Sequence, residues 1–405
     1  MAQKLKWYNT FSEQAEEALL KLDPEFKALP DIKPAPGFYT LNKGKPRLLP
    51  VKEGEDAPKW TDPGVSERVK KVAAGPALTG AAAYNMGAVL EVEGDLKGAR
   101  TWYEKAVAVD AGLSDAVARL GVIALDEGDM AAANAQFAKA LQIDPANSGA
   151  HNFEAAKAVK AGNYTEAINH ARMALVSDPD SMDAYLNLMA AYYEMGLLDV
   201  GILVGRNALG LDKKDGPIQN LMGLIFVKKE EVRNAVKLFE KAVNDDPGLY
   251  DARMDLGAVT LAYKDYATAV VQYRKAVELN AASIPAKMGL AVALRGQGNG
   301  EEALSILKGI ASRDPRNADV HYNLCLLYQE TLSDYDKALA ECRQFVSMAP
   351  THPKRAQALI RIEGIETIKE AMQEDESSDV KPEEAPEASD EAGSTAGSTS
   401  GDGGK

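Results

Sequence analysis

The chain has few of the residues from which active sites are usually built. Its 405 residues contain two cysteines, four histidines and 6% aromatic residues. The histidines form no pair with each other or with cysteine at zinc-ligand spacing. The sequence also lacks a GxxxxGK[ST] phosphate loop and a GxSxG nucleophile motif. These absences predict a protein that is not an enzyme and that binds no cofactor or metal.

Long apolar stretches are also missing. The longest, Leu221 to Val227, is far too short to span a bilayer. Residues 1–22 alternate charged and apolar side chains and lack the uninterrupted apolar core of a secretory signal. We therefore expect a cytoplasmic protein without direct membrane insertion. The alternative is a periplasmic location, which would require a signal peptide upstream of the sequence given.

Negative charge dominates, but it is unevenly distributed. The formal net charge is −14. Residues 373–405 contribute −8 from ten acidic and two basic residues, and residues 1–79 contribute +2 from thirteen basic and eleven acidic ones. With no basic stripe to neutralise phosphates, nucleic acid is a poor partner. The tail, residues 374–405, has almost no apolar residue and is predicted to be disordered.

A pattern that recurs every 34 residues from Gly80 organises most of the chain. Within each copy, positions 8, 20 and 27 are small, position 24 is bulky and position 32 is often proline, as in Gly121, Ala133, Ala140, Phe137 and Pro145. A break near position 15 separates two predicted antiparallel helices, and the small position 8 faces the bulky position 24.

This ladder resembles that of the tetratricopeptide repeat (TPR) superfamily. The resemblance implies an all-α, right-handed solenoid of about eight helix-turn-helix repeats at 80–352. The eighth copy carries one extra residue in its turn. Residues 353–373 then repeat apolar side chains at helical spacing and are predicted to form a capping helix.

Residues 1–79 form a separate N-terminal region. A capping box at Thr10 to Glu13 predicts a helix ending near Asp23, and Val65 to Val72 suits a second short helix. Between them, residues 30–63 contain seven prolines and should be extended. Two interpretations fit: an arm wrapped over the first repeat, or a linear docking motif for another protein.

The two cysteines are expected to face each other. Cys325 occupies position 8 of the last repeat and Cys342 its equivalent of position 24. They are interpreted either as two small buried apolar residues or as a disulfide, which would favour an oxidising compartment.

The concave groove is the predicted partner site. In the superfamily, positions 2, 5, 6, 9, 12 and 13 of the first helix line the groove that holds peptides. Carried onto this sequence, those positions include Tyr84, Asn85, Asn152, Leu186, Asn187, Tyr193, Asn220, Met254, Met288, Tyr322 and Asn323. We expect Tyr193 and Asn220 to be partly exposed. The Lys and Asn clamp of chaperone-binding members is not matched.

The resemblance implies a protein-binding scaffold or adaptor in a multiprotein complex, holding extended or helical segments of one or more partner proteins. The alternatives are a component of a bacterial envelope assembly, secretion or gliding-motility machine, to which the likeness is faint, and a regulatory subunit that presents substrate to a separate enzyme.

Repeat 4 departs from the ladder. Its position 8 is the large Met189, and the opposing helix carries Gly201, Gly205 and Gly210. The glycines either accommodate Met189 or create a soft joint or a slot for a partner helix.

Overall fold

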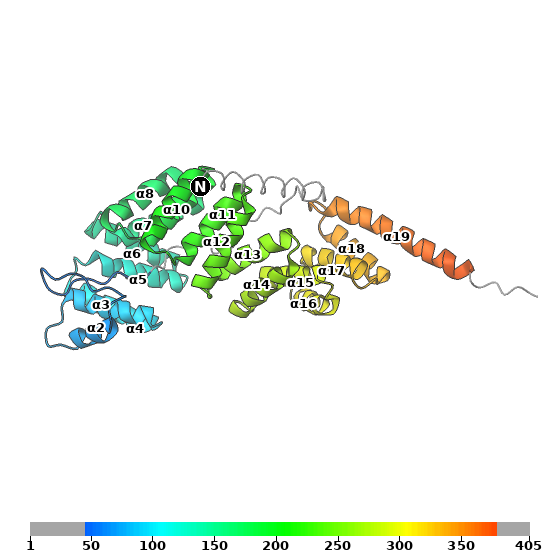
Figure 1. Ribbon diagram of the computed structural model, residues 1–405. Coiled ribbons are helices and arrows are strands. Elements are labelled where there is room, and N and C mark those ends of the chain that lie inside the picture. The colour runs from blue at the N-terminus through cyan, green and yellow to red at the C-terminus, as the bar shows by residue number, and fades with distance from the viewer. Residues whose placement is uncertain (1–44, 379–405) are drawn as a thin grey trace, which may run out of the picture. The chain divides into compact units, whose positions relative to one another are not determined.

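The computed structural model describes residues 45–378, with side-chain placement up to residue 373. Within this range the chain forms eighteen α-helices and no strand (Figure 1). The predicted helix near Thr10, residues 30–44 of the proline-rich segment and the acidic tail from residue 379 lie outside the described residues. Residues 374–378, which were predicted to belong to the disordered tail, instead continue the last helix.

Sixteen of the helices form eight antiparallel pairs, in which we call the first helix A and the second B. The pairs are α3 (Gly80–Val92) and α4 (Leu96–Val109), α5 (Ser114–Asp126) and α6 (Met130–Ile143), α7 (Ser148–Ala161) and α8 (Tyr164–Ser177), α9 (Met182–Glu194) and α10 (Leu198–Leu211), α11 (Gly216–Lys228) and α12 (Val232–Asp245), α13 (Tyr250–Ala262) and α14 (Tyr266–Leu279), α15 (Ile284–Gly296) and α16 (Gly300–Arg313), and α17 (Ala318–Glu330) and α18 (Tyr335–Met348). α2 (Val65–Ala73) precedes them, and α19 (Arg355–Ser378) follows them.

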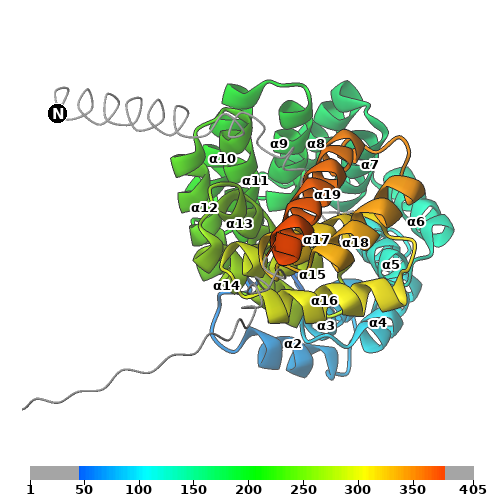
Figure 2. The same cartoon turned by 90° about the vertical axis from the view of Figure 1, so that its right-hand side faces the viewer.

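The pairs belong to two compact units, whose boundary falls between Ile310 and Ala311 inside α16. In the first unit, successive A helices contact one another, from α5 through α7, α9, α11 and α13 to α15. Figure 2 shows α10 and α12 on the outer side of α11 and α13. The A helices therefore form the inner face of this unit.

Local sequence sets the helix ends. At repeat position 15, Gly94, Gly128, Gly162 and Gly196 adopt φ values between 73° and 89°, which reverse the chain after the A helix. In repeat 5 the same position is Glu230, which adopts φ 63°. An aspartate commonly follows, and the side chains of Asp95, Asp129 and Asp265 accept a hydrogen bond from the first turn of the B helix.

Complementary side-chain volumes join the two helices of a pair. A Cβ atom placed on Gly121 would lie 3.0 Å from the Phe137 ring, and one on Gly223 would lie 2.5 Å from the Phe239 ring. Both rings are fully buried. The predicted contact between a small position 8 and a bulky position 24 is confirmed in these repeats.

Position 4 of the A helix has a role that the sequence did not predict. The His151 Nε2 lies 2.9 Å from the carbonyl oxygen of Pro145, and Gln219 and Arg253 donate to the carbonyl oxygens of Lys213 and Pro247. Each acceptor stands at position 32 of the preceding repeat. Polar side chains at position 4 therefore fix the turn between consecutive repeats and are more than packing residues.

The described part of the N-terminal region packs on repeat 1. Leu48, Leu49, Val65 and Val69 are buried in one apolar cluster with the inner residues of α3. The Trp60 indole donates to the carbonyl oxygen of Pro46 at 2.6 Å. For residues 45–79 these contacts fit the arm interpretation.

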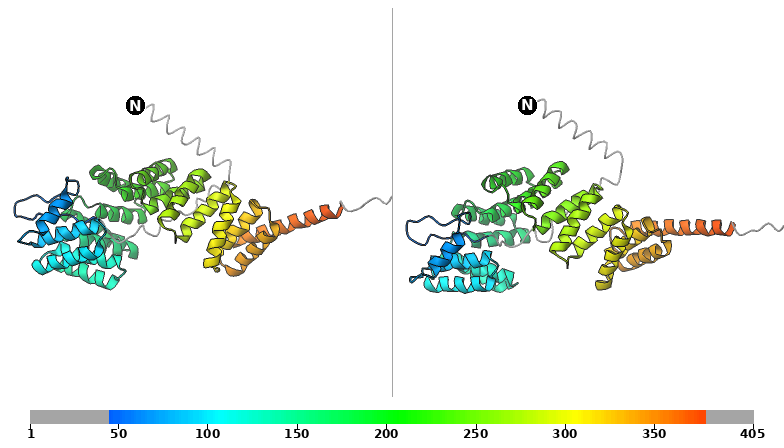
Figure 3. Two further views of the ribbon diagram at one scale, coloured as in Figure 1. Left: turned by 90° about the horizontal axis from the view of Figure 1, so that it is seen from below. Right: turned by 60° about the horizontal axis from the view of Figure 1, so that its bottom comes forward.

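In the second unit, α17, α18 and α19 pack together, and α19 extends beyond the end of α18 (Figure 3). Ala358 on α19 is buried with Tyr322 and Phe345. Cys325 and Cys342 form a disulfide with their Cα atoms 5.1 Å apart, joining α17 to α18. Both cysteines are buried.

The glycines of repeat 4 face neighbouring side chains. A Cβ on Gly201 would lie 2.9 Å from Ile225 Cδ1, and one on Gly205 would lie 2.8 Å from Met222 and 2.9 Å from Met189. The slot interpretation is therefore wrong at these two positions, because α9 and α11 already fill the space. Gly210 is exposed, with nothing within 4 Å of such a Cβ.

Candidate functional site

The residues predicted to line the groove lie on A helices. In the first unit they lie on α3, α7, α9, α11, α13 and α15, and in the second unit Tyr322 and Asn323 lie on α17. Leu186, Asn187, Met254 and Met288 are half-buried. Most of the others are buried, with exposed fractions of 4% for Asn220 and 9% for Tyr193. The expectation of partial exposure at these two residues is wrong, because neighbouring A helices cover them.

Asn85 shows how this inner face holds an extended chain. Its Nδ2 donates to the carbonyl oxygen of Leu49 at 2.8 Å, and its Oδ1 accepts from the Leu49 amide at 2.7 Å. Leu49 belongs to the arm segment, residues 45–50, which has no regular secondary structure. One asparagine side chain thus satisfies both main-chain groups of an extended residue.

Asn152 lies on α7 at repeat position 5, one residue before the position of Asn85, and its bonding is incomplete. Its Nδ2 donates to Ser181 Oγ at 2.9 Å, and its main-chain carbonyl oxygen accepts from Asn187 at 3.1 Å. The Oδ1 atom is buried and has no hydrogen-bond partner. A buried acceptor without a donor is costly, and it can be satisfied by an incoming N–H group.

Asn220 on α11 has the same deficit. Its Nδ2 donates to Asp255 Oδ2 on α13 at 2.8 Å, while its Oδ1 has no partner. Burial, with a smaller contribution from the nearby Asp251, raises the pKa of Asp255 to about 7 against the opposing effect of the Asn220 hydrogen bond.

The second unit orders its predicted groove residues differently. The Tyr322 hydroxyl donates to Gln357 Oε1 on α19 at 3.3 Å, so the capping helix contacts this side chain. Asn323 Nδ2 donates to the carbonyl oxygen of Asp319, one turn earlier in the same helix.

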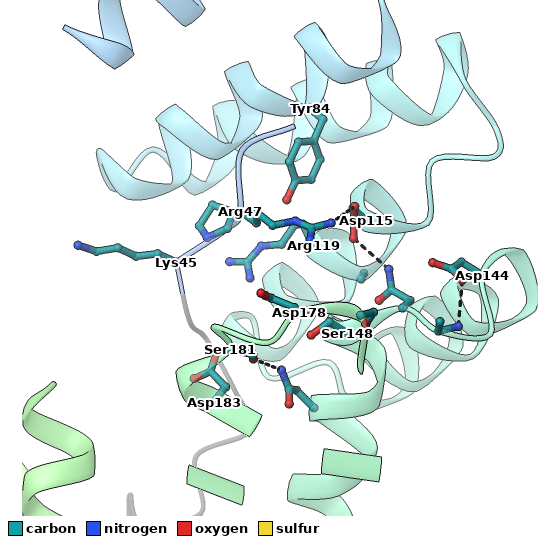
Figure 4. A pocket seen from close by; sticks show the side chains of 17 residues that line it. Lys45, Arg47, Tyr84, Asp115, Arg119, Asp144, Ser148, Asp178, Ser181 and Asp183 are labelled. Carbon is teal, nitrogen blue, oxygen red and sulfur yellow. Dashed lines mark hydrogen bonds and ion pairs between the residues drawn. The ribbon is translucent and has the colours of Figure 1, made fainter. Parts of the chain in front are cut away.

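A polar cavity of about 130 Å³ opens on the inner face of repeats 1 to 4, beside the arm segment (Figure 4). We call it the acidic cavity. Asn152 lines it, and its charged lining residues are Lys45, Arg47, Asp115, Arg119, Asp144, Asp178 and Asp183. Figure 4 shows the carboxylates of Asp178 and Asp183 on the side where the Lys45 to Arg47 stretch lies.

Some of these charges are already paired. Arg47 Nη2 lies 3.8 Å from Asp115 Oδ2, and the Asn147 amide also donates to Asp115. Arg119 Nε donates to Glu91 at 3.1 Å, in a pair with little solvent exposure. Burial raises the pKa of Asp115 and lowers that of Arg119, in both cases because desolvation disfavours the charged form.

Among residues 45–378, no three His, Cys, Asp or Glu side chains are grouped so as to hold a metal ion. No helix in the same range is both long and apolar enough to cross a membrane.

Sequence reasoning missed the charged members of the site. Arg119 and Asp255 occupy position 6, the position of Asn85 and Asn187 in their own repeats. Comparing all polar residues at position 6, instead of asparagines alone, would have identified both. Asp144 and Asp178 stand at position 31, which the sequence pattern assigned only to the turn before proline.

Comparisons with known proteins agree with this architecture. Models described as tetratricopeptide repeat match residues 114–147, 154–215 and 260–325. No curated protein matches the chain in sequence.

Several solved structures have similar folds. The crystal structure of YrrB, described as a TPR protein with an unusual peptide-binding site, is 25% identical over 46% of this chain and 96% of YrrB, with a TM-score of 0.42. The human IFIT1 dimer with m7Gppp-AAAA is 16% identical over 75% of this chain and 76% of IFIT1, with a TM-score of 0.51. PilW, a type IV pilus biogenesis factor, is 20% identical over 52% of this chain and 98% of PilW, with a TM-score of 0.46.

At these identities, the similarity to IFIT1 and PilW concerns the fold alone. The 34-residue ladder, the paired helices and three matching family models lead to one conclusion, which is that this chain belongs to the tetratricopeptide repeat superfamily.

Proposed function

We propose that this protein is a non-catalytic scaffold whose inner helices hold extended segments of partner proteins through main-chain hydrogen bonds to asparagine side chains. The observation that carries the proposal is the double hydrogen bond between Asn85 and Leu49. It is an intramolecular example of the contact proposed for partners. Asn152 and Asn220 support it, since each leaves a buried amide oxygen to accept a main-chain N–H group.

The experiment compares two alanine variants of the full chain in affinity purification followed by mass spectrometry. Asn152→Ala removes a groove acceptor, whereas Asn207→Ala changes an exposed asparagine on the outer helix α10. A protein that is captured by the wild type and by Asn207→Ala, but lost with Asn152→Ala, supports the proposal. Partners captured equally by all three forms would contradict it. Circular dichroism melting checks that both variants remain folded.

A second candidate is a component of a bacterial envelope assembly, secretion or motility machine. One observation favours it: the Cys325–Cys342 disulfide, a bond typical of oxidising compartments. On this candidate the location is periplasmic and not cytoplasmic. Cell fractionation decides between the two locations. Recovery of the protein in the cytosol of spheroplasts would count against the envelope candidate.

A further inference from the structure

We infer that the acidic cavity binds the cationic side chain of a lysine or arginine in an extended partner segment, while Asn152 Oδ1 accepts a main-chain N–H of the same segment. This inference rests on the proposed function, because it assumes that partner segments lie along the inner face. It adds the chemical class of the segment and the place where its charge is bound.

The charge balance of the cavity is the first argument. Arg47 is paired with Asp115, and Arg119 with Glu91. Among the described residues that line the cavity, Asp144 and Asp178 then remain with one further cation, Lys45, which comes from the arm segment. The Asp144 carboxylate also accepts from the Ala146 amide, a contact that leaves its charge in place. The cavity thus has room and negative charge for one more cationic group.

The second argument is independent of charge. Asn152 lines the cavity with 3% of its surface exposed, and its Oδ1 has no partner. An extended segment that delivers an N–H group here would satisfy this atom, as Leu49 satisfies Asn85 Oδ1. An acceptor and an anionic wall in one cavity suit a basic peptide better than an isolated cation.

The arm segment supplies the third argument. Lys45 and Arg47 already place two basic side chains along this wall, and Leu49 in the same segment is bound by Asn85. Basic side chains and main-chain binding thus occur together within residues 45–50. A partner segment of the same chemistry would continue this arrangement toward α7 and α9.

The test uses pools of nine-residue acetylated and amidated peptides, random except at one position fixed as Lys, Arg, norleucine or Glu. Binding of each pool to the full chain is measured by fluorescence anisotropy. We expect the Lys and Arg pools to bind about tenfold more tightly than the Glu pool, and Asp178→Asn to remove most of that preference. Asp212→Asn, at the same repeat position but outside the cavity, should keep it. Asparagine occurs naturally at this position as Asn280, so the substitution suits the turn.

The outcomes separate the two proposals. If the pools bind without a preference for Lys and Arg, or if that preference persists in Asp178→Asn, this inference is overturned. The proposed function is unaffected by either result. No binding by any pool contradicts both. A photo-crosslinking residue in place of Ser148, which lines the cavity, identifies the occupant. Crosslinks to the basic peptides support the inference, whereas crosslinks to residues 1–44 of the chain itself, or to a second copy, overturn it.

Discussion

Replacing Asp255 by asparagine should stabilise the protein at alkaline pH. Asp255 is 3% exposed, and its carboxyl group accepts a hydrogen bond from Asn220 Nδ2. Its pKa rises from 3.8 to about 7 because burial disfavours the carboxylate. An asparagine keeps the acceptor for Asn220 Nδ2 and adds an N–H donor for the unpartnered Asn220 Oδ1.

The sign follows from proton linkage. Between pH 3.8 and about 7 the folded state keeps the Asp255 proton while the unfolded state has lost it, so stability falls as the pH rises through this window. Above pH 7 the folded carboxyl is also ionised, and this contribution becomes constant. A pKa rise from 3.8 to about 7 corresponds to at most about 4 kcal/mol. Asp255→Asn has no such loss. Its free energy of unfolding should therefore exceed that of the wild type only slightly near pH 4 and by about 1 to 4 kcal/mol at pH 8.5.

Urea denaturation of both forms across this pH range measures the difference, because the other titrating groups are common to both proteins. Hydrogen exchange of the amides in α11 and α13 shows whether the effect is located between these helices. Glu240→Gln, at an exposed position on α12, is the matched control and should show a small difference that is independent of pH. An Asp255→Asn difference that stays the same at pH 4 and pH 8.5 would refute the reasoning.

Three further predictions follow from the repeat geometry. Gly223→Ala should destabilise the protein by about 2 kcal/mol, because the added Cβ would lie 2.5 Å from the Phe239 ring. Gly210→Ala, at an exposed position, should stabilise the protein by about 0.5 to 1 kcal/mol. Thermal melting ranks the two variants, and a higher melting temperature for Gly223→Ala would contradict the packing argument. Glu230→Gly should stabilise the protein by about 1 kcal/mol, because glycine adopts the positive φ at this position without strain. A lower free energy of unfolding in urea would contradict this prediction. Non-reducing peptide mapping should recover Cys325 linked to Cys342, and reduction should cost about 3 kcal/mol; free thiols in native protein would contradict the disulfide.

The sequence predicted the fold well because the contacts that define it are local. Gly121 and Phe137 lie sixteen residues apart within one repeat, and their complementary volumes recur at the same spacing in other repeats. The helix ends could also be predicted from the sequence, because a glycine, which adopts a positive φ, and a capping aspartate mark the turn. Such contacts need no knowledge of how one repeat is oriented on the next.

The candidate site was less predictable because it depends on contacts between repeats and with the arm. Repeat position places Asn220 on the inner face, but its burial depends on how closely α13 packs against α11. The contact between Leu49 and Asn85 joins residues 36 positions apart, and no repeat pattern extends into the arm. The acidic cavity combines residues from the arm, the turns and four A helices, α3, α5, α7 and α9. None of these groups is close to the others in sequence.

Asn85, Asn152 and Asn220 show why a partly satisfied inner face suits binding. Asn85 has both side-chain groups bonded to an extended segment, whereas Asn152 and Asn220 each keep one buried acceptor without a donor. An unsatisfied buried acceptor costs about 1 to 3 kcal/mol, so each of these sites lowers the stability of the free protein. A segment that donates an N–H group recovers part of that free energy only when it is bound. Binding of this kind raises the stability of the folded state by an amount that grows with the logarithm of the segment's concentration above its Kd. The same unsatisfied acceptors that weaken the empty groove therefore favour its occupied form.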